Sequence, residues 1–583
     1  MYLKLKKVGD RTHMMIAHGY RDKKTKNVRT KTIKTIGYVD DYLDQYPDPI
    51  AHFKEVAKQM TVAEKAQRKV TLTIDFSEAL EAGADSVKNL GYAAILKIYH
   101  ELKLDQYFNN DARNHEFEFS PNSIMVMLVV SRLLSPGSKL KAFEEKDRYF
   151  ERFDFSLVDV YRALSYYASV ELEVQRHINE QITAFYGQRN TETIYYDVTN
   201  YYFEIDQEDD LRKYGFSKEH RKDPIVQMGL AMDADGLPLH YKLFPGSLPD
   251  KSTFRSVIGE VRRNYNTGRI VVVADMGVIT GDNIYYLIGG EKRDKTHKGY
   301  VLSYSIRGST GEFKKYVLDR TGYRGRDGNA AEEDADFMIK SEHIAREINV
   351  TMSSGKTSTK IVYEKRIVFW AKKYADKAKA DRERVILKAN AIVNDPGKYK
   401  KSTSYGASKY IKNIDFDKQT GDVITTGKAL VFDEAKLKEE EKYDGYYSIV
   451  TSEKHMTDAE IIDTYRGLWE IEETFRITKG TLEARPVYVS RPDRINAHFL
   501  TCFIALTIMR LLQKRINKRY SSDEIVKCLN LINCMHEHEN IYLFGYLSET
   551  SKSIGDALGI DFTKKRLRLG EIKNIVAESK RCH

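Results

Sequence analysis

The segment between residues 191 and 306 constrains the fold most, because it contains a series of strand patterns separated by turns and helices. TETIYYDVTNYYFEI has the composition of a strand, and DPIVQMGLAM and LPLHYKLF form a hairpin pattern around the turn DADG. RIVVVAD is a continuous apolar run, typical of a strand buried on both faces, and GYVLSYSI follows after a short helical stretch. Three adjacent strands, a helix and further strands separated by helices predict a mixed α/β sheet flanked by helices.

The chain is too long for one hydrophobic core, since 583 residues exceed the size at which domains divide. The alternation of apolar and basic residues in VRTKTIKTI predicts a basic β-hairpin near the N-terminus. This hairpin is either a DNA-contacting arm or a strand edge kept soluble by lysine. The patterns predict six regions: a basic hairpin and linker (1–85), a helical region (86–190), the first part of the sheet (191–306), a β-rich insertion domain with a helical arm (307–443), the second part of the sheet with a long helix (444–520), and a C-terminal helical region (521–583). Only the family resemblance given below implies that the helical region 86–190 binds DNA ends.

The composition of the chain indicates what kind of molecule it binds. The formal net charge is +10, and charged residues make up 31% of the chain, which favours a polyanionic partner. Four cysteines are too few for a disulfide framework, and the N-terminal MYLKLKKVGDRTH lacks the apolar segment of a signal peptide. The longest apolar runs fall short of the roughly 18 residues of a membrane span. We therefore expect a cytoplasmic protein associated with the nucleoid.

Three carboxylates occupy positions that are costly for a charge. Asp197 interrupts a strand of aromatic and β-branched residues, and Asp275 ends the most apolar strand, although an Asp at a strand end is often only a turn or capping residue. One helix is predicted from about residue 457 to 479, and at 100° per residue Tyr465, Glu472 and Lys479 share one line of it. Glu472 is then predicted to lie within the apolar stripe of this helix.

The type of these residues indicates a metal-dependent reaction. If Glu472 does not simply pair with Arg476 one turn away, two Asp from neighbouring strands and one Glu from a helix make an all-oxygen ligand set. Such a set suits Mg²⁺, with Mn²⁺ as a substitute, and not zinc. Two such ions support phosphodiester cleavage, and the sequence contains no P-loop, GxSxG or HExxH pattern for another common mechanism.

The segment YRGLWEIEETFRITK carries a specific resemblance. Together with YDVTNYYFE and VVVADMG, it resembles the DDE transposases of bacterial insertion sequences, in the group with a Tyr-Arg-Glu-Lys signature, over about residues 190 to 515. Tyr465, Glu472 and Lys479 match the signature in register, whereas Leu468 stands at the Arg position, which contacts the DNA end in that family. Arg476 or Arg466 would have to compensate.

The resemblance implies an RNase H-like core in which Asp197, Asp275 and Glu472 hold two Mg²⁺ ions. It further implies that Tyr465 and Lys479 hold the phosphate of the transposon end, although they are equally a packed Tyr and a helix-terminal Lys if the resemblance is set aside. His220, Arg221 and Lys222 add positive charge beside the sheet and are candidate DNA contacts.

The implied activity is cut-and-paste transposition. Water attacks the phosphate at the end of the element, and the freed 3′-OH attacks target DNA, with double-stranded DNA as the partner and at least a homodimer in the complex of both ends. Two alternatives remain open: an RNase H-like nuclease or junction resolvase that does not join strands, and a noncatalytic DNA-binding protein descended from a transposase. A glycosidase that uses two of the acids is more remote, because the basic charge gives no reason for it.

Overall fold

The computed structural model divides the chain into two compact units, Met1–Ala84 and Asp85–His583. It describes all residues except 22–26, 67–76, 78, 80–86, 219–221, 266, 279, 291–297, 333, 400–403, 405, 417–422, 426–429 and 582–583. Each unit is described separately below.

The N-terminal unit contains an antiparallel sheet in the order β1-β2-β3, followed by helix α1. Its elements are β1 (Tyr2–Val8), β2 (Arg11–Arg21), β3 (Val28–Tyr38) and α1 (Pro49–Ala66). Met14 and Ile16 of the central strand are fully buried, whereas residues 28 to 35 of β3 are all exposed. The predicted basic hairpin corresponds to β2 and β3, and β1 adds a third strand that the pattern did not indicate.

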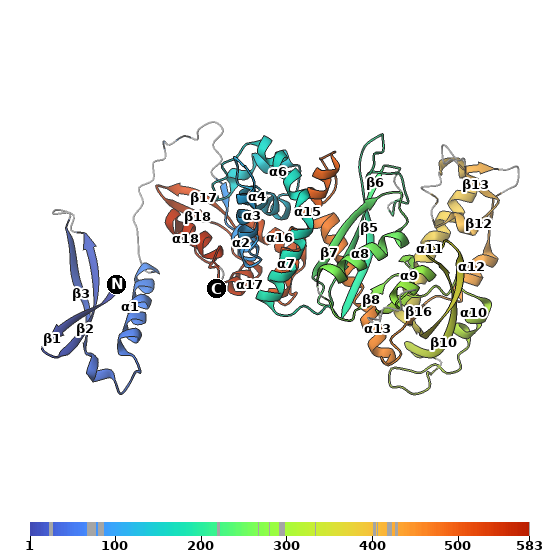
Figure 1. Ribbon diagram of the computed structural model, residues 1–583, viewed down its shortest axis with the longest axis horizontal. Coiled ribbons are helices and arrows are strands. Elements are labelled where there is room, and N and C mark those ends of the chain that lie inside the picture. Colours follow the sequence, from blue (N-terminus) through green and yellow to red (C-terminus); the bar gives the residue numbers. More distant parts are fainter. Residues whose placement is uncertain are drawn as a thin grey trace. The chain divides into compact units, whose positions relative to one another are not determined.

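The second unit is built on an eight-stranded sheet in the order β10-β11-β16-β9-β8-β5-β6-β7 (Figure 1). Its first part comprises β5 (Thr193–Tyr202), β6 (Ile225–Met232), β7 (Pro238–Pro245), α8 (Asp250–Asn264), β8 (Val271–Ala274), α9 (Gly281–Leu287) and β9 (Gly299–Ser303). β5, β6 and β7 are antiparallel neighbours, and β8 and β9 continue the sheet parallel to β5. This is the strand order 3-2-1-4-5 of an RNase H-like core, so the predicted mixed α/β sheet flanked by helices is confirmed.

The region between β9 and β16 partly continues this sheet. It holds α10 (Gly311–Leu318), β10 (Phe337–Thr351), β11 (Thr357–Ala371), α11 (Lys372–Asn394), β12 (Ile411–Lys412), β13 (Ile414–Phe416), β14 (Val423–Thr425), β15 (Val431–Phe432) and α12 (Glu434–Glu441). The long β10–β11 hairpin joins the main sheet through β16 (Tyr446–Thr451), while β12 to β15 form two small two-stranded sheets. The hairpin of the expected insertion therefore shares the sheet of the core.

One face of the sheet is covered by the helical segments that follow β16. These are α13 (Asp458–Arg466), α14 (Trp469–Arg476), a π-helical turn (Ile477–Thr481) and α15 (Pro492–Arg515). α15 contacts α4 and α6 of the preceding helical region, which comprises β4 (Val87–Asn89), α2 (Tyr92–Glu101), α3 (Leu104–Asp111), α4 (Pro121–Leu134), α5 (Lys139–Glu144), α6 (Leu157–Ser169) and α7 (Glu171–Tyr186). By length and composition α15 could cross a membrane, but 94% of its apolar window is buried inside the protein, as in the central helix of a globular core.

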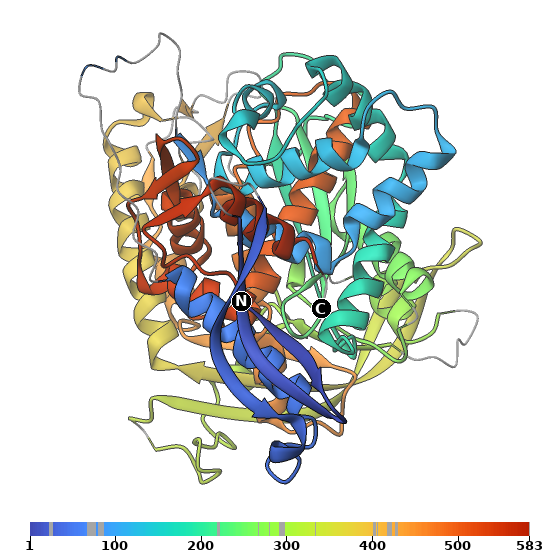
Figure 2. The same ribbon diagram turned by 90° about the vertical axis from the view of Figure 1, so that its left-hand side faces the viewer.

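The C-terminal segment packs against this helical region (Figures 1 and 2). It comprises α16 (Ser522–Leu531), β17 (Asn533–His538), β18 (Ile541–Phe544), α17 (Glu549–Leu558), β19 (Arg566–Arg568) and α18 (Leu569–Ser579). Its strands form a four-stranded sheet with β4, in the order β19-β18-β17-β4. The segment that we expected to be helical thus also contains strands, and they pair with a strand more than 400 residues earlier in the chain.

Candidate active site

Two of the predicted acids lie in one row across adjacent strands. Ala274 is the last residue of β8. It pairs with Tyr196 of β5 on one side and with Leu302 of β9 on the other. The next residues along the three strands are therefore Asp197, Asp275 and Ser303, and residues in matching register point to the same face of a sheet. Ser303 Oγ donates a hydrogen bond to Asp275 Oδ1 at 2.6 Å. The sheet register thus brings Asp197 and Asp275 together.

A lysine and a further acid lie beside Asp197. Lys218 Nζ is 3.8 Å from Asp197 Oδ1 and 4.0 Å from Asp250 Oδ2, at the first residue of α8. Burial raises the pKa of Asp197 to about 6; the charge of Lys218 and the Val198 N–H oppose this rise, and the charges of Asp275 and Asp250 add to it. Repulsion between neighbouring carboxylates of this kind is relieved by a bound cation.

The helix that follows is broken by a side chain from the sheet. Tyr195, two residues before Asp197 and on the same face of β5, donates its hydroxyl hydrogen to the Thr464 carbonyl at 3.1 Å. In a continuous helix that carbonyl would accept from the N–H of Leu468, which instead bonds to the Tyr465 carbonyl. A Cβ on Gly467 would lie 1.9 Å from the Tyr195 hydroxyl, so only glycine leaves room for the ring. The predicted single helix is therefore wrong, because it consists of α13 and α14 with a turn between them.

The break rotates the buried stripe of α14 relative to that of α13. Glu472 is exposed, contrary to the prediction that it lies within the apolar stripe, and the buried acid of this helix is Glu470. Arg510 of α15 donates to the Glu470 carbonyl at 2.8 Å and to Thr474 Oγ1 at 2.7 Å, and its guanidinium lies 3.5 Å from the Glu470 carboxylate. Arg510 thereby holds the inner side of α14, and Glu472 is left on the open side.

Tyr465 connects Glu472 with the strand row. Its hydroxyl lies beside Ser303, whose own hydroxyl donates to Asp275. Burial raises the pKa of Tyr465 to about 12; the Ser303 hydroxyl opposes this rise, and the charges of Asp275 and Glu472 add to it. Both acids are therefore within electrostatic range of one phenol group.

The donor atoms suit a hard divalent cation, since carboxylate and hydroxyl oxygens are the ligands that Mg²⁺ prefers. Asp197 and Asp275 stand in register, and Glu472 approaches the same region from α14. In the part of the chain that the structure describes, no three His, Cys, Asp or Glu side chains lie close enough together to hold a metal ion. Asp197 and Asp275 therefore lie in one row, and Glu472 does not complete a three-acid cluster with them.

The remaining signature positions differ in their surroundings. Lys479 lies in the π-helical turn, with Nζ 5.6 Å from the centre of the Tyr201 ring, which is on the same face of β5 as Asp197. Leu468, at the signature Arg position, is buried in the core, so no side chain reaches DNA from there.

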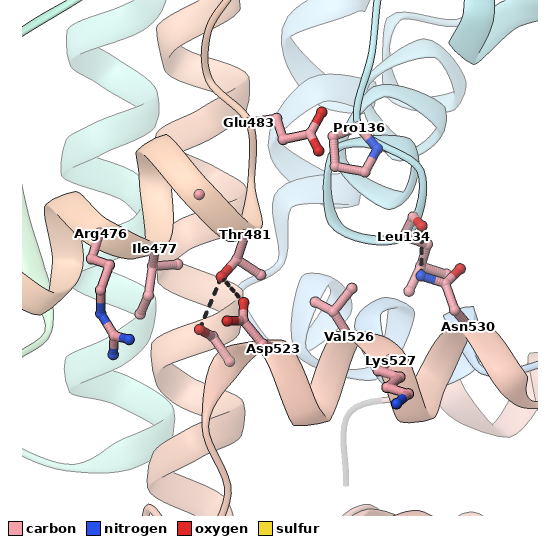
Figure 3. A pocket seen from close by; sticks show the side chains of 12 residues that line it. Leu134, Pro136, Arg476, Ile477, Thr481, Glu483, Asp523, Val526, Lys527 and Asn530 are labelled. Atoms are coloured by element: carbon pink, nitrogen blue, oxygen red, sulfur yellow. Dashed lines mark hydrogen bonds between the residues drawn. The ribbon is translucent and has the colours of Figure 1, made fainter.

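The basic residues expected to act in its place are exposed. Arg466 pairs with Asp463 at 3.1 Å, and Arg476 pairs with Glu473 at 3.4 Å, not with Glu472 as one alternative had it. Arg476 also lines a cavity of about 520 Å³ between the π-helical turn and α16 (Figure 3). His220 and Arg221 lie outside the described residues.

Comparison with protein families agrees with this geometry. Residues 196–508, more than half of the chain, match the family model of the transposase DDE domain. The chain belongs to the DDE transposases. Residues 3–69 of this transposase match the N-terminal domain of IS1634 family transposases. No curated protein matches the sequence.

Sequence reasoning missed several residues at the site of the transposase. Ser303 ends the strand GYVLS, and its place beside Asp275 follows only when the order of β8 and β9 is known. Lys218 and Asp250 come from a loop and a helix start, where no periodic pattern marks them. Tyr195 lies in a strand rich in aromatic residues, and only its close approach to Gly467 shows that its side chain reaches the helix.

Proposed function

We propose that this transposase cuts DNA at the ends of its element and joins the freed 3′-OH to target DNA, with Asp197, Asp275 and Glu472 as the metal-binding carboxylates. The observation that carries the proposal is the register that places Asp197 and Asp275 side by side at the centre of the RNase H-like sheet. Two Mg²⁺ ions, when bound there, would activate the attacking oxygen and stabilise the leaving oxygen.

The protein's own residues would position the DNA strand. In this proposal Ser303 holds Asp275 in one orientation through its hydrogen bond, and Tyr465 lies beside Ser303. Tyr465 and Lys479 then flank the carboxylates and grip phosphate oxygens, the phenol through its hydroxyl and the ammonium through its charge. Arg466 and Arg476 are exposed on the same two helices and would add contacts to the DNA backbone, together with His220 and Arg221.

We further propose that the basic N-terminal unit and the helical region before the core bind the element's ends. Lys4 and Lys6 are both exposed and lie on one face of β1. The complex would contain a homodimer and double-stranded DNA from two ends and a target, and the reaction would take place in the cytoplasm, at the nucleoid. Mn²⁺ would substitute for Mg²⁺.

The test uses purified full-length protein and a labelled duplex from the DNA that flanks its gene, with Mg²⁺ or EDTA and a supercoiled target plasmid. We expect metal-dependent cutting at the end and joining to the plasmid, both lost in Asp197→Asn and Glu472→Gln. Glu549→Gln is the matched control, because Glu549 is an exposed acid in the first turn of α17. Binding of Mn²⁺, measured by calorimetry, should weaken in the first two variants and not in the control.

The alternatives give different results in the same experiment. Cutting without joining would indicate a nuclease or resolvase. DNA binding without cutting, equal in the wild type and all variants, would indicate a noncatalytic DNA-binding protein.

A further inference from the structure

The backbone that follows Lys479 is held by side chains from two distant helices. The carbonyls of residues 482 and 483 accept hydrogen bonds from Nη1 of Arg132 in α4, at 3.2 and 3.0 Å. The next carbonyl, that of Ala484, lies 2.9 Å from Nε2 of His498 in α15. Three successive carbonyls are thus bound by side chains from outside the segment, so the chain leaves the π-helical turn along one fixed path.

A third basic side chain determines which nitrogen of His498 carries the hydrogen. Lys139 Nζ lies 3.1 Å from Nδ1 of His498 and donates to it, so the imidazole hydrogen is on Nε2 and points to the Ala484 carbonyl. Arg132, Lys139 and His498 are only 5, 4 and 3% exposed. In the described part of the chain no carboxylate forms an ion pair with any of them, and burial of unpaired basic groups is unfavourable. The backbone carbonyls are therefore the acceptors that compensate this burial.

The turn itself is fastened on both sides of Lys479. Tyr201 donates its hydroxyl hydrogen to Thr478 Oγ1 at 3.1 Å, and Thr481 Oγ1 is 3.1 Å from Ser522 Oγ at the start of α16 (Figure 3). A π-helical turn is rare, and it occurs mostly as a single turn within an α-helix. Release of the segment after the turn would allow it to relax toward α-helical geometry, which rotates the Lys479 side chain about the helix axis.

We infer that Arg132 and His498 are positioning residues for Lys479. By fixing the carbonyls after the turn, they keep its π-helical geometry and hold the Lys479 ammonium beside Tyr201, on the face of the sheet that carries the acids. Both residues are buried, so neither contacts DNA itself. The inference rests on the proposed function, because it assumes that Lys479 binds a phosphate of the element's end.

The first experiment is a double-mutant cycle on binding of an end duplex from the DNA flanking the gene. Binding is measured by fluorescence anisotropy in EDTA, so that no cutting occurs. Lys479→Met should weaken binding roughly tenfold, as expected for loss of one charged hydrogen bond. Arg132→Gln should weaken it roughly fivefold in the presence of Lys479 and not at all in the Lys479→Met background, because an effect exerted through Lys479 disappears with it. A purely structural effect would persist in both backgrounds.

Duplexes that carry one neutral methylphosphonate at a time give an independent measurement. At the position of the phosphate that Lys479 holds, neither Lys479→Met nor Arg132→Gln should weaken binding further, because the charge that the ammonium attracts is gone. At the other positions both variants should keep their effects. If the effect of Lys479→Met vanishes at one position and that of Arg132→Gln stays equal at all positions, the inference is wrong.

Two further substitutions control for loss of folding. His498→Leu should reproduce the loss seen in Arg132→Gln, and His498→Gln, which keeps a donor, should restore most of the binding; this pair carries the test if Arg132→Gln does not fold. Arg189→Gln is the matched control, because Arg189 is also buried and donates to the carbonyls of residues 237 and 238 at 2.8 and 3.0 Å. It should lower the melting temperature and leave end binding unchanged. An equal loss of end binding in Arg189→Gln would overturn the inference.

The same samples separate this inference from the proposed function. If Lys479→Met binds the end as tightly as the wild type does, the proposed phosphate contact fails, and the inference fails with it. If Lys479→Met weakens binding and its effect simply adds to that of Arg132→Gln, only the inference fails.

Discussion

Replacing Gly467 by alanine tests the contact that breaks the catalytic helix. The new Cβ would lie 1.9 Å from the Tyr195 hydroxyl and 2.4 Å from Cζ, so the ring must move. Overpacking of this kind costs about 1 to 3 kcal/mol. Loss of the hydrogen bond to the Thr464 carbonyl adds about 0.5 to 1.5 kcal/mol. Alanine regains only about 0.5 to 1 kcal/mol over glycine in a helix, so Gly467→Ala should destabilise the protein by roughly 1 to 3 kcal/mol.

The sign of this effect should reverse when the ring is absent. In a Tyr195→Leu background the clash is removed and only the helix preference remains, so Gly467→Ala should stabilise that variant by about 0.5 to 1 kcal/mol. Urea unfolding followed by tryptophan fluorescence is a suitable assay, because Trp469 is one of only two tryptophans and lies next to the break. A neutral or stabilising effect of Gly467→Ala in the presence of Tyr195 would refute the reasoning.

Three further predictions concern charge. Glu472→Gln should abolish cutting and leave the unfolding midpoint unchanged, since Glu472 is exposed. Glu470→Ala should destabilise the protein by about 1 to 3 kcal/mol in thermal unfolding, because buried Arg510 loses the nearer of its two carboxylates and keeps only Glu473 at 3.8 Å. Burial, aided by a nearby arginine, lowers the pKa of Lys139 to about 7, so the unfolded chain binds more protons between pH 7 and its ordinary pKa of about 10.4. The free energy of unfolding should therefore rise by up to about 1.4 kcal/mol per pH unit across that window. If this rise is equally large in the wild type and in Lys139→Met, the prediction is contradicted. Replacing Lys4 and Lys6 by glutamine should lower the slope of log affinity against log salt by up to about two for end DNA, and an unchanged slope would exclude them as phosphate contacts.

The sheet was predictable from the sequence because its signals are local. The apolar run before Asp275 and the hairpin pattern around the turn DADG both reflect burial of neighbouring residues, and the structure has strands there. Asp197 and Asp275 were recognisable as costly charges in these strands. The pairing order of the strands then determined how the two acids meet, and the mixed sheet topology limited that order to few arrangements.

The features that sequence reasoning missed depend on contacts between distant segments. The wheel placed Glu472 in the apolar stripe because it assumed an unbroken helix, and the break comes from Tyr195, which is more than 260 residues earlier. Helix periodicity cannot show such an intrusion. Likewise, nothing near the segments from which Lys218 and Asp250 come indicates that they meet beside Asp197.

The pairing of β9 with β16 determines where this protein tolerates changes in length. The chain leaves β9 at Ser303 and returns beside it in β16, after β10 and β11 have formed the far edge of the same sheet, and Ile449 of β16 lies directly opposite Ser303. The two ends of the segment between β9 and β16 are thus fixed side by side. Residues can therefore be added to or removed from the part of this segment outside the main sheet without shifting Asp197 and Asp275. Within β8 the opposite holds, because deleting one residue before Asp275 would turn that carboxylate to the other face of the sheet. A fusion partner or label is therefore best inserted between β11 and β16, where β12 to β15 lie outside the main sheet, and the strand that leads to Asp275 must keep its exact length.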